Sequence, residues 1–336
     1  MKAFSIQAPG EIAPIVGEAQ EISAGLVKVR VTHAALTEND FLLYRRGEGL
    51  YPIIPSRSAI GVISESEEGG RFHKGDKVYL KPNAPCGNCF ECRSGKPKEC
   101  KSQRCYGENT DGFLRDFITL PEDNLVEIPP QADPVDLLLT ESVSMAIAAI
   151  DALGIEKGEH IVVMGATPIG NLLCQLALYY QAIPILFDTD EERLQQAKAM
   201  GVYYAFHADT DIIRHVKQAT AGRMARYVAY VSGSGIEIDG TLKCLSTGGR
   251  LALLGCGAEV ASAPLGTVLS KKLTVFGISD GYKEIASAIN LLVSADINTE
   301  GLFERKVRYV DVPALFEEVK GDKLFNRVFV VDCLAD

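Results

Sequence analysis

Residues 161–170 read IVVMGATPIG, a short apolar run followed by a turn that begins and ends with glycine. The run at 161–164 predicts a buried strand, and the stretch 171–181 after the turn predicts a helix. A strand, a glycine-containing turn and a helix in this order are typical of a dinucleotide-binding unit, in which the pyrophosphate rests on the helix N-terminus. An ordinary tight turn is the alternative.

The turn departs from the Gly-x-Gly-x-x-Gly pattern at its middle position, where Thr167 stands in place of glycine. Gly165 would make the tight turn, and Gly170 would let helix and strand pack closely. Backbone N–H groups remain in the turn, and Pro168 suits a first helical turn. We therefore predict a nucleotide-binding turn that consists of Gly165, Thr167, Pro168, Ile169 and Gly170.

Asp188 ends the next predicted strand, which starts at Pro184, and lies 23 residues after Gly165. A carboxylate at this place accepts hydrogen bonds from the adenosine ribose hydroxyls and repels a 2′-phosphate. The position therefore favours NAD over NADP and strengthens the case for nucleotide binding.

The pattern of predicted strands and helices differs before and after this motif. After it come a predicted helix at 191–200 and apolar strands at 227–231 and 251–255. Apolar strands separated by helices indicate a parallel sheet covered on both faces. The first 130 residues instead show short, closely spaced strands with Gly and Pro between them, which is typical of a compact β-rich barrel.

With 336 residues the chain is long for a single core, so we predict two domains in an α/β protein. Residues 150–280 are predicted to form a Rossmann-type nucleotide-binding domain with a doubly wound parallel sheet. Residues 1–149 and 281–336 are predicted to form the second, β-rich domain, because the final strand at 327–331 follows a self-contained α/β block.

Four cysteines lie close together in the stretch PCGNCFECRSGKPKEC, in a lobe at about residues 85–101. Thiolates at this density favour a tetrahedral zinc ion, and a closed set of four leaves no open position for water. We therefore predict one structural zinc ion. An iron–sulfur cluster, a disulfide pair and unligated thiols are the alternatives. The predicted ligands are Cys86, Cys89, Cys92 and Cys100.

The net charge of −10 and the pI near 5.2 argue against nucleic acid or an anionic membrane as a partner. No window approaches the roughly 18 uninterrupted apolar residues of a membrane helix. The first ten residues lack the basic stretch and apolar run of a signal peptide, and the remaining cysteines are scattered singly, as reduced thiols are. We expect a cytoplasmic protein that acts on a small molecule.

The cysteine lobe and the nucleotide-binding motif together resemble those of the zinc-containing medium-chain dehydrogenase/reductase family, above all its polyol and threonine dehydrogenase branch. The lobe matches the family's structural-zinc motif position for position. The stretches 111–113, 125–129 and 249–255 resemble further segments of the family. This resemblance implies a GroES-like catalytic domain beside the Rossmann domain and an NAD-dependent oxidoreductase activity.

The same resemblance implies further roles. Arg193 would contact the adenosine ribose, and Arg327 would reach the pyrophosphate. The apolar stretch 273–278 is similar to the strand that family members pair across a subunit interface, which implies a homodimer or homotetramer.

The chain departs from the family at the catalytic zinc site. The family's cysteine ligand leads a C-x-[ST]-D motif, which corresponds here to Thr37-Glu38-Asn39-Asp40. The family's Gly-His-Glu, which carries the histidine ligand, corresponds to Ser56-Arg57-Ser58. Only the ligand position held by Cys or Glu is kept, as Glu141. Threonine is a poor zinc ligand, arginine is none, and a single carboxylate cannot hold the ion, so we predict that catalytic zinc is absent.

Arg57 would then take the place of the metal. Asp40 is kept, and Arg57 is expected to pair with Asp40, Glu38 or Glu141. The guanidinium would bind a carbonyl oxygen or a substrate anion near the region that zinc would fill. A structural salt bridge in a site that has lost its metal is the alternative. Thr37 and Tyr44 are candidates for relaying a proton, and the predicted catalytic set is Thr37, Asp40, Arg57 and Glu141.

These observations predict an NAD-dependent oxidoreductase that transfers hydride between nicotinamide and a small alcohol, polyol or carbonyl compound. Alcohol oxidation without zinc would need a side-chain base, for which Glu38 and Glu141 are candidates. A zinc-free enone or quinone reductase is a close variant, although such relatives usually lack the cysteine lobe. A catalytically silent NAD-binding sensor or assembly subunit is the alternative of another class.

Overall fold

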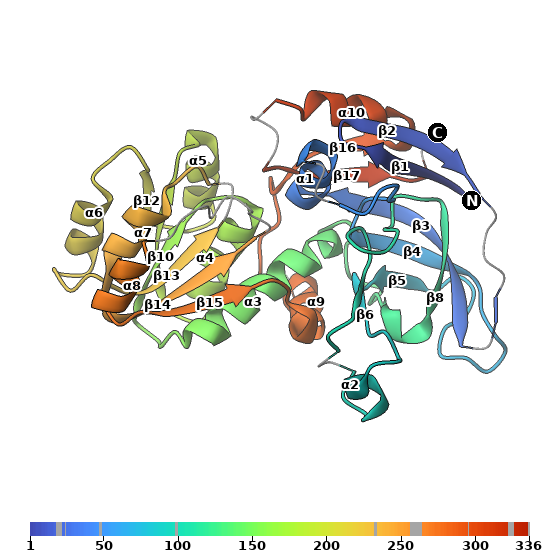
Figure 1. Ribbon diagram of the computed structural model, residues 1–336, viewed down its shortest axis with the longest axis horizontal. Helices are drawn as coiled ribbons and strands as arrows, with labels where there is room; N and C mark the ends of the chain where they lie inside the picture. Colours follow the sequence, from blue (N-terminus) through green and yellow to red (C-terminus); the bar gives the residue numbers. More distant parts are fainter. Residues whose placement is uncertain are drawn as a thin grey trace. The chain divides into compact units, whose positions relative to one another are not determined.

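The computed structural model describes residues 1–17, 22–23, 25–46, 49–97, 100–231, 234–255, 264–294, 296–321 and 326–334. Contacts between residues divide the chain into two compact units (Figure 1). The first unit consists of Met1–Thr140 and Leu302–Asp336, and the second unit is Glu141–Gly301. Among the described residues, no helix combines the length and apolarity that crossing a bilayer requires.

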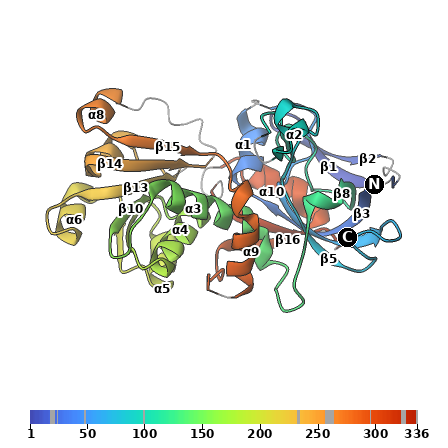
Figure 2. The same ribbon diagram turned by 90° about the horizontal axis from the view of Figure 1, so that it is seen from below.

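The second unit contains the predicted parallel sheet. Its strand order is β12-β11-β10-β13-β14-β15, and all neighbours are parallel. Figure 2 shows β10, β13, β14 and β15 of this sheet. The order reverses between β10 and β13, which is where doubly wound folds bind their nucleotide. The strands are β10 (His160–Met164), β11 (Ile183–Asp188), β12 (Tyr204–His207), β13 (Ala225–Val231), β14 (Leu245–Leu254) and β15 (Thr274–Ile278).

Helices alternate with these strands along the chain, as the pattern predicts. Residues 161–164 and 185–187 are fully buried, as expected for strands that are covered on both faces. The fold-class prediction is therefore confirmed. The helices of the second unit are α3 (Thr140–Leu153), α4 (Pro168–Tyr179), α5 (Glu191–Ala199), α6 (Ile212–Ala219), α7 (Ile238–Cys244), α8 (Leu265–Ser270) and α9 (Ile285–Val293), with the 3₁₀ turn η4 (Tyr282–Glu284).

The division into units differs from the predicted boundaries, 149/150 and 280/281. The first of these falls inside α3, and the second lies before α9. The two segments pack tightly on each other, since a Cβ atom on Gly281 would lie 2.2 Å from the Ser144 carbonyl carbon in α3. Arg250 of β14 also donates a hydrogen bond of 2.8 Å to the carbonyl oxygen at the end of α3, at residue 152.

The first unit is built on a mostly antiparallel sheet with the order β16-β17-β3-β4-β5-β9, and β8 pairs with β3. Separate two-stranded sheets join β1 to β2 and β6 to β7. Its strands are β1 (Lys2–Ala8), β2 (Glu11–Val16), β3 (Leu26–Leu36), β4 (Ser58–Glu65), β5 (Lys77–Leu80), β6 (Asn83–Ala84), β7 (Arg104–Cys105), β8 (Phe117–Pro121), β9 (Leu125–Glu127), β16 (Phe303–Arg308) and β17 (Val328–Asp332).

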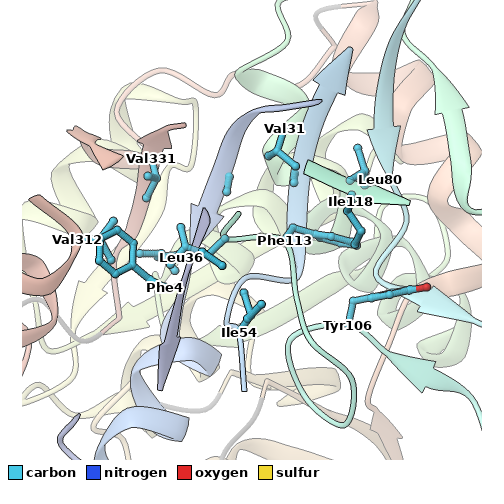
Figure 3. Close-up of a cluster of buried hydrophobic side chains, with 14 of the residues drawn as sticks. Phe4, Val31, Leu36, Ile54, Leu80, Tyr106, Phe113, Ile118, Val312 and Val331 are labelled. Atoms are coloured by element: carbon cyan, nitrogen blue, oxygen red, sulfur yellow. The ribbon is translucent and has the colours of Figure 1, made fainter. Parts of the chain in front are cut away.

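The C-terminal strand returns to the first unit, as expected, because β17 pairs antiparallel with β3. One apolar core joins both parts of this unit: Phe4, Leu36 and Phe113 pack in the same cluster as Val312 and Val331 (Figure 3). The helical segments of the unit are α1 (Glu38–Arg46), α2 (Phe90–Arg93), α10 (Val312–Glu318) and the 3₁₀ turns η2 (Glu122–Asn124), η3 (Asp136–Leu139) and η5 (Tyr309–Asp311).

Candidate functional site

The glycine-containing turn joins β10 to α4 in the second unit. Gly165 has φ of 113°, and a Cβ atom there would lie 2.8 Å from the Ser234 Cβ. A Cβ atom on Gly170 would lie 1.8 Å from the Gly165 carbonyl oxygen, so only glycine permits this approach of helix to strand. Thr167 is the N-cap of α4, and Pro168 and Ile169 are its first two residues.

The start of α4 can accommodate an anion. The side chain of the N-cap residue, Thr167, makes no capping hydrogen bond. It therefore does not use the free N–H groups of the first helical turn. Free N–H groups and the positive end of the helix dipole attract a pyrophosphate. The turn therefore fits the dinucleotide that the sequence predicts, with the pyrophosphate resting on the N-terminus of α4.

Asp188 lies at the carboxyl end of β11 and is fully buried. Its Oδ2 accepts a hydrogen bond from the Ala166 N–H inside the glycine turn. Its Oδ1 accepts bonds from the Asp190 N–H at 2.7 Å and from Arg193 Nη2 at 2.6 Å. The predicted residues Asp188 and Arg193 thus form one ion pair beside the turn, and the carboxylate fixes the turn against β11.

The four cysteines of the lobe converge. Their sulfur atoms all lie within 4.8 Å of one another, and those of Cys89 and Cys100 are 3.7 Å apart. A tetrahedral zinc bound at about 2.3 Å requires sulfur atoms about 3.8 Å apart, so the set fits one ion. An iron–sulfur cluster is larger than one ion and would need wider spacing. The residues that would hold zinc are Cys86, Cys89, Cys92 and Cys100.

Backbone N–H groups already point at the thiols. The N–H groups of Asn88 and Cys89 lie 3.4 Å and 3.3 Å from Cys86 Sγ, and these bonds lower the pKa of that thiol to about 6. The Cys92 N–H lies 3.5 Å from Cys89 Sγ. Donors that favour thiolate are what a closed zinc site needs around its ligands.

Thr37 and Asp40 stand together at the start of α1. The backbone N–H and the hydroxyl of Thr37 donate to Asp40 Oδ2 at 2.8 Å and 3.2 Å, and the Ser56 N–H donates to Asp40 Oδ1 at 2.6 Å. Burial raises the pKa of Asp40 to about 6, against the opposing effects of these bonds and of the Arg57 charge. Asp40 therefore links the backbone at Ser56 to the start of α1 by hydrogen bonds.

Arg57 follows Ser56, whose backbone has a left-handed φ of 77°, a conformation that a non-glycine residue rarely adopts and that is common at functional sites. The Arg57 side chain is only 6% exposed. Its Nη1 donates to Glu108 Oε2 at 2.7 Å and its Nη2 to Asn83 Oδ1 at 3.3 Å. Glu108, whose side chain is 61% exposed, was not among the partners that the sequence predicted.

No local signal in the sequence points to Glu108 or Asn83. They lie 51 and 26 residues from Arg57, and the fold brings them there. A Cβ atom on Gly107 would lie 2.8 Å from the Ser56 carbonyl oxygen, so the segment that carries Glu108 packs directly on the Arg57 segment. Only this tertiary contact identifies the pair.

Glu141 is in the first turn of α3, directly after the boundary between the two units. Arg327 precedes β17 in the first unit, with its Nε 3.6 Å from Glu304 Oε2. The Tyr44 hydroxyl lies 2.8 Å from the Gly10 carbonyl oxygen and 2.7 Å from Glu317 Oε1. These bonds assign Tyr44 to packing within the first unit, so we do not retain it as a proton relay.

Two family models match the chain. The alcohol dehydrogenase GroES-like domain matches residues 23–130, and the zinc-binding dehydrogenase model matches residues 168–294. A Haemophilus influenzae protein named as an uncharacterized zinc-type alcohol dehydrogenase-like protein is 30% identical over 325 residues, which cover 95% of each chain. A probable D-xylulose reductase A of Emericella nidulans is 26% identical over 281 residues, covering 81% of this chain and 78% of the relative.

A solved structure shares the fold over nearly the whole chain. An alcohol dehydrogenase from E. coli CFT073, in complex with the cofactor NADH, superposes with a TM-score of 0.86 at 23% identity and covers 99% of both chains.

Proposed function

The chain belongs to the zinc-containing medium-chain dehydrogenase/reductase family, and we propose on that premise that it uses NAD to oxidise or reduce a small alcohol, polyol or carbonyl compound without a catalytic zinc ion. As a member of this family it is a nicotinamide-dependent oxidoreductase. The observation that carries the zinc-free part of the proposal is that Arg57, which the sequence resemblance places where the family has its histidine ligand, is buried and ion-paired with Glu108.

Two of the three side chains that the sequence resemblance places at the catalytic zinc positions, Thr37 and Arg57, do not fit the metal. Thr37 directs its hydroxyl to the Asp40 carboxylate, and the Arg57 guanidinium stays protonated and has no lone pair to offer a cation. A positive charge on Arg57 would also repel a divalent ion. The cysteine lobe, in contrast, offers four thiols at zinc spacing, so we propose one structural zinc ion per chain.

The nicotinamide supplies the hydride chemistry, and the protein orients the substrate and stabilises charge on its oxygen. Arg57 is the cation for this role, since a guanidinium forms strong charge-assisted hydrogen bonds with an oxyanion. Its partner Glu108 is 61% exposed, so water can solvate that carboxylate when it releases Arg57. A substrate oxygen can then replace Glu108 as the partner of the buried guanidinium. Glu38 and Glu141 remain the proposed bases for the oxidation direction.

A catalytically silent NAD-binding protein is the second candidate. The Arg57–Glu108 ion pair is the observation that favours it, because such a pair also stabilises a site that no longer performs chemistry. Oxidation of NADH with a panel of aldoses, ketoses, simple ketones and enones separates the two. Steady turnover with one member and one zinc ion per chain by elemental analysis are the expected results. Binding of NADH without any turnover would favour the silent protein, and two zinc ions per chain would overturn the zinc-free site.

Asp188 supports NAD as the cofactor, because its carboxylate would repel a 2′-phosphate. In Asp188→Ser, Arg193 loses its buried partner and becomes available to a phosphate. We expect the Kd for NADH to rise by roughly tenfold or more, since one charge-assisted bond is worth about 1.5 kcal/mol or more. The preference for NADH over NADPH should fall by at least the same factor. Fluorescence titration with both cofactors measures this.

The matched control is Asp209→Ser, which removes an exposed carboxylate at the end of the neighbouring strand, β12. It should leave both affinities unchanged. An unaltered NADH-to-NADPH preference in Asp188→Ser would contradict the assignment.

We also propose that the chain forms a homodimer or homotetramer. β15 is an edge strand of the parallel sheet, and its Val275 is 42% exposed. An exposed edge with apolar side chains is a template for pairing with a second copy.

A further inference from the structure

A cavity of about 310 Å³ lies in the first unit, apart from the residues around Arg57. Its walls come from β3, β8 and the segment 104–111, and neither Arg57 nor Asp40 lines it. Its volume is at the lower end of the range for small-molecule sites, which begins at roughly 300 Å³. The cavity is therefore large enough for a small ligand and not only for an ion.

A buried arginine lines this cavity. Arg115 is 8% exposed, its Nε donates to the Gly112 carbonyl oxygen at 2.8 Å, and its Nη1 lies 3.6 Å from the Met1 sulfur. Within the part of the chain that the structure describes, no carboxylate forms an ion pair with it. Burial lowers the pKa of Arg115, and the more distant charges of Asp111 and Asp116 oppose that effect only in part. A buried cation without an ion-pair partner costs several kcal/mol.

Two further donors face the same space. The Tyr106 ring is buried against Phe113, with centroids 5.1 Å apart, and its hydroxyl points away from the apolar cluster (Figure 3). Among the described residues this hydroxyl has no hydrogen-bond partner, although Tyr106 lines the cavity. Arg104 lies on the same wall, is exposed, and also forms no ion pair with a described residue. Arg104, Tyr106 and Arg115 thus present unused donors to one space.

The cavity wall also carries acceptors. Asp111 uses Oδ1 to accept the Ile54 N–H at 3.0 Å, and Thr110 donates its hydroxyl hydrogen to Asn109 at 3.1 Å, which leaves lone pairs on both side chains. The two remaining cations already have partners. Lys28 is paired with Glu65 at 2.8 Å, and the Met1 α-ammonium group donates to the Gly17 carbonyl oxygen at 3.0 Å. The net positive charge of the wall therefore rests on the two arginines, and its acceptors suit ligand hydroxyls.

We propose that this cavity binds a small hydroxylated phosphate ester, with its phosphate group held by Arg104, Arg115 and the Tyr106 hydroxyl and its hydroxyls held by Asp111 and Thr110. An arginine pair matches the oxygens of a phosphate, and the anion supplies the partner that buried Arg115 lacks. The site is separate from the proposed catalytic residues. A sugar phosphate bound here would therefore act as an effector or would be the remote part of a larger substrate.

Isothermal titration calorimetry of the zinc-loaded, full-length protein tests the proposal. Saturating ADP-ribose fills the nucleotide site and offers no nicotinamide to reduce, so heat from turnover is absent. The probes are glucose 6-phosphate, inorganic phosphate and glucose. We expect binding of glucose 6-phosphate, weaker binding of phosphate and none of glucose. Arg104→Ala and Tyr106→Phe should each weaken glucose 6-phosphate binding, the former roughly tenfold, as loss of a charge-assisted bond implies.

The matched control is Arg214→Ala, which removes an exposed arginine from α6 in the second unit. It should leave the affinity unchanged. Equal affinity for phosphate and glucose 6-phosphate would support the phosphate site but would contradict the proposed contacts with the ligand hydroxyls. Absence of binding by both anions, or identical affinities in the wild type, Arg104→Ala and Tyr106→Phe, would overturn it.

Discussion

Replacing Arg57 with alanine is expected to lower kcat by about 100- to 1000-fold, the loss that follows removal of a preorganised donor to a developing oxyanion. The change should fall on kcat and kcat/KM more than on KM, because the charge on the substrate oxygen is greatest in the transition state. NADH oxidation with the substrate found in the panel measures both constants. The affinity for NADH should be unchanged, since the nucleotide turn lies in the second unit.

Two companion variants separate a catalytic from a structural role of Arg57. Arg57→Lys keeps the charge and should recover part of the lost kcat. Glu108→Gln removes the carboxylate partner and leaves the guanidinium, so it should retain kcat or raise it. If Arg57 serves only a structural ion pair, Arg57→Ala and Glu108→Gln should both alter the melting temperature while kcat stays at the wild-type value.

Loss of the lobe's metal should have the second large effect. Cys100→Ser removes the most buried of the four thiols, and we expect the zinc content to fall from one ion per chain to near zero. Structural zinc contributes roughly 10–16 kcal/mol in small peptides. A loss of even about 3 kcal/mol would lower the melting temperature of a unit of this size by about 6–12 °C. Elemental analysis and thermal unfolding followed by circular dichroism measure the two quantities.

Cys105→Ser is the matched control, because Cys105 lies just after the lobe and is not one of the four converging thiols. It should keep both the zinc ion and the melting temperature. Wild-type stability in Cys100→Ser, or iron in place of zinc in the purified protein, would contradict the assignment.

Local patterns could be predicted well from the sequence, and long-range contacts could not. Four cysteines within 15 residues define a metal lobe by spacing alone, and the strand, turn and helix around Gly165 are contiguous. The helix α4 begins at Pro168, earlier than the predicted 171, because proline and the free N–H groups of the turn already form the first helical turn. These features need only short-range information.

The partners of Arg57 required the fold. The sequence gives no signal for Glu108, which reaches the guanidinium from a segment that packs on the loop around Ser56. The bounds of the two compact units differ from the predicted domain boundaries for a similar reason. Helical composition does not reveal on which unit a helix packs, and the close approach of Gly281 to Ser144 is visible only in three dimensions.

The pairing of β17 with β3 also dictates an order of assembly during synthesis. The ribosome completes residues 141–301 before it makes the strand that finishes the sheet of the first unit. The second unit can therefore fold as an inserted module while β3 still waits for its C-terminal neighbour. A chain that ends before residue 328 would leave residues 33–36 of β3 unpaired on one side, because β8 covers only residues 26–30 of that edge. We expect such a chain to aggregate through this unpaired edge.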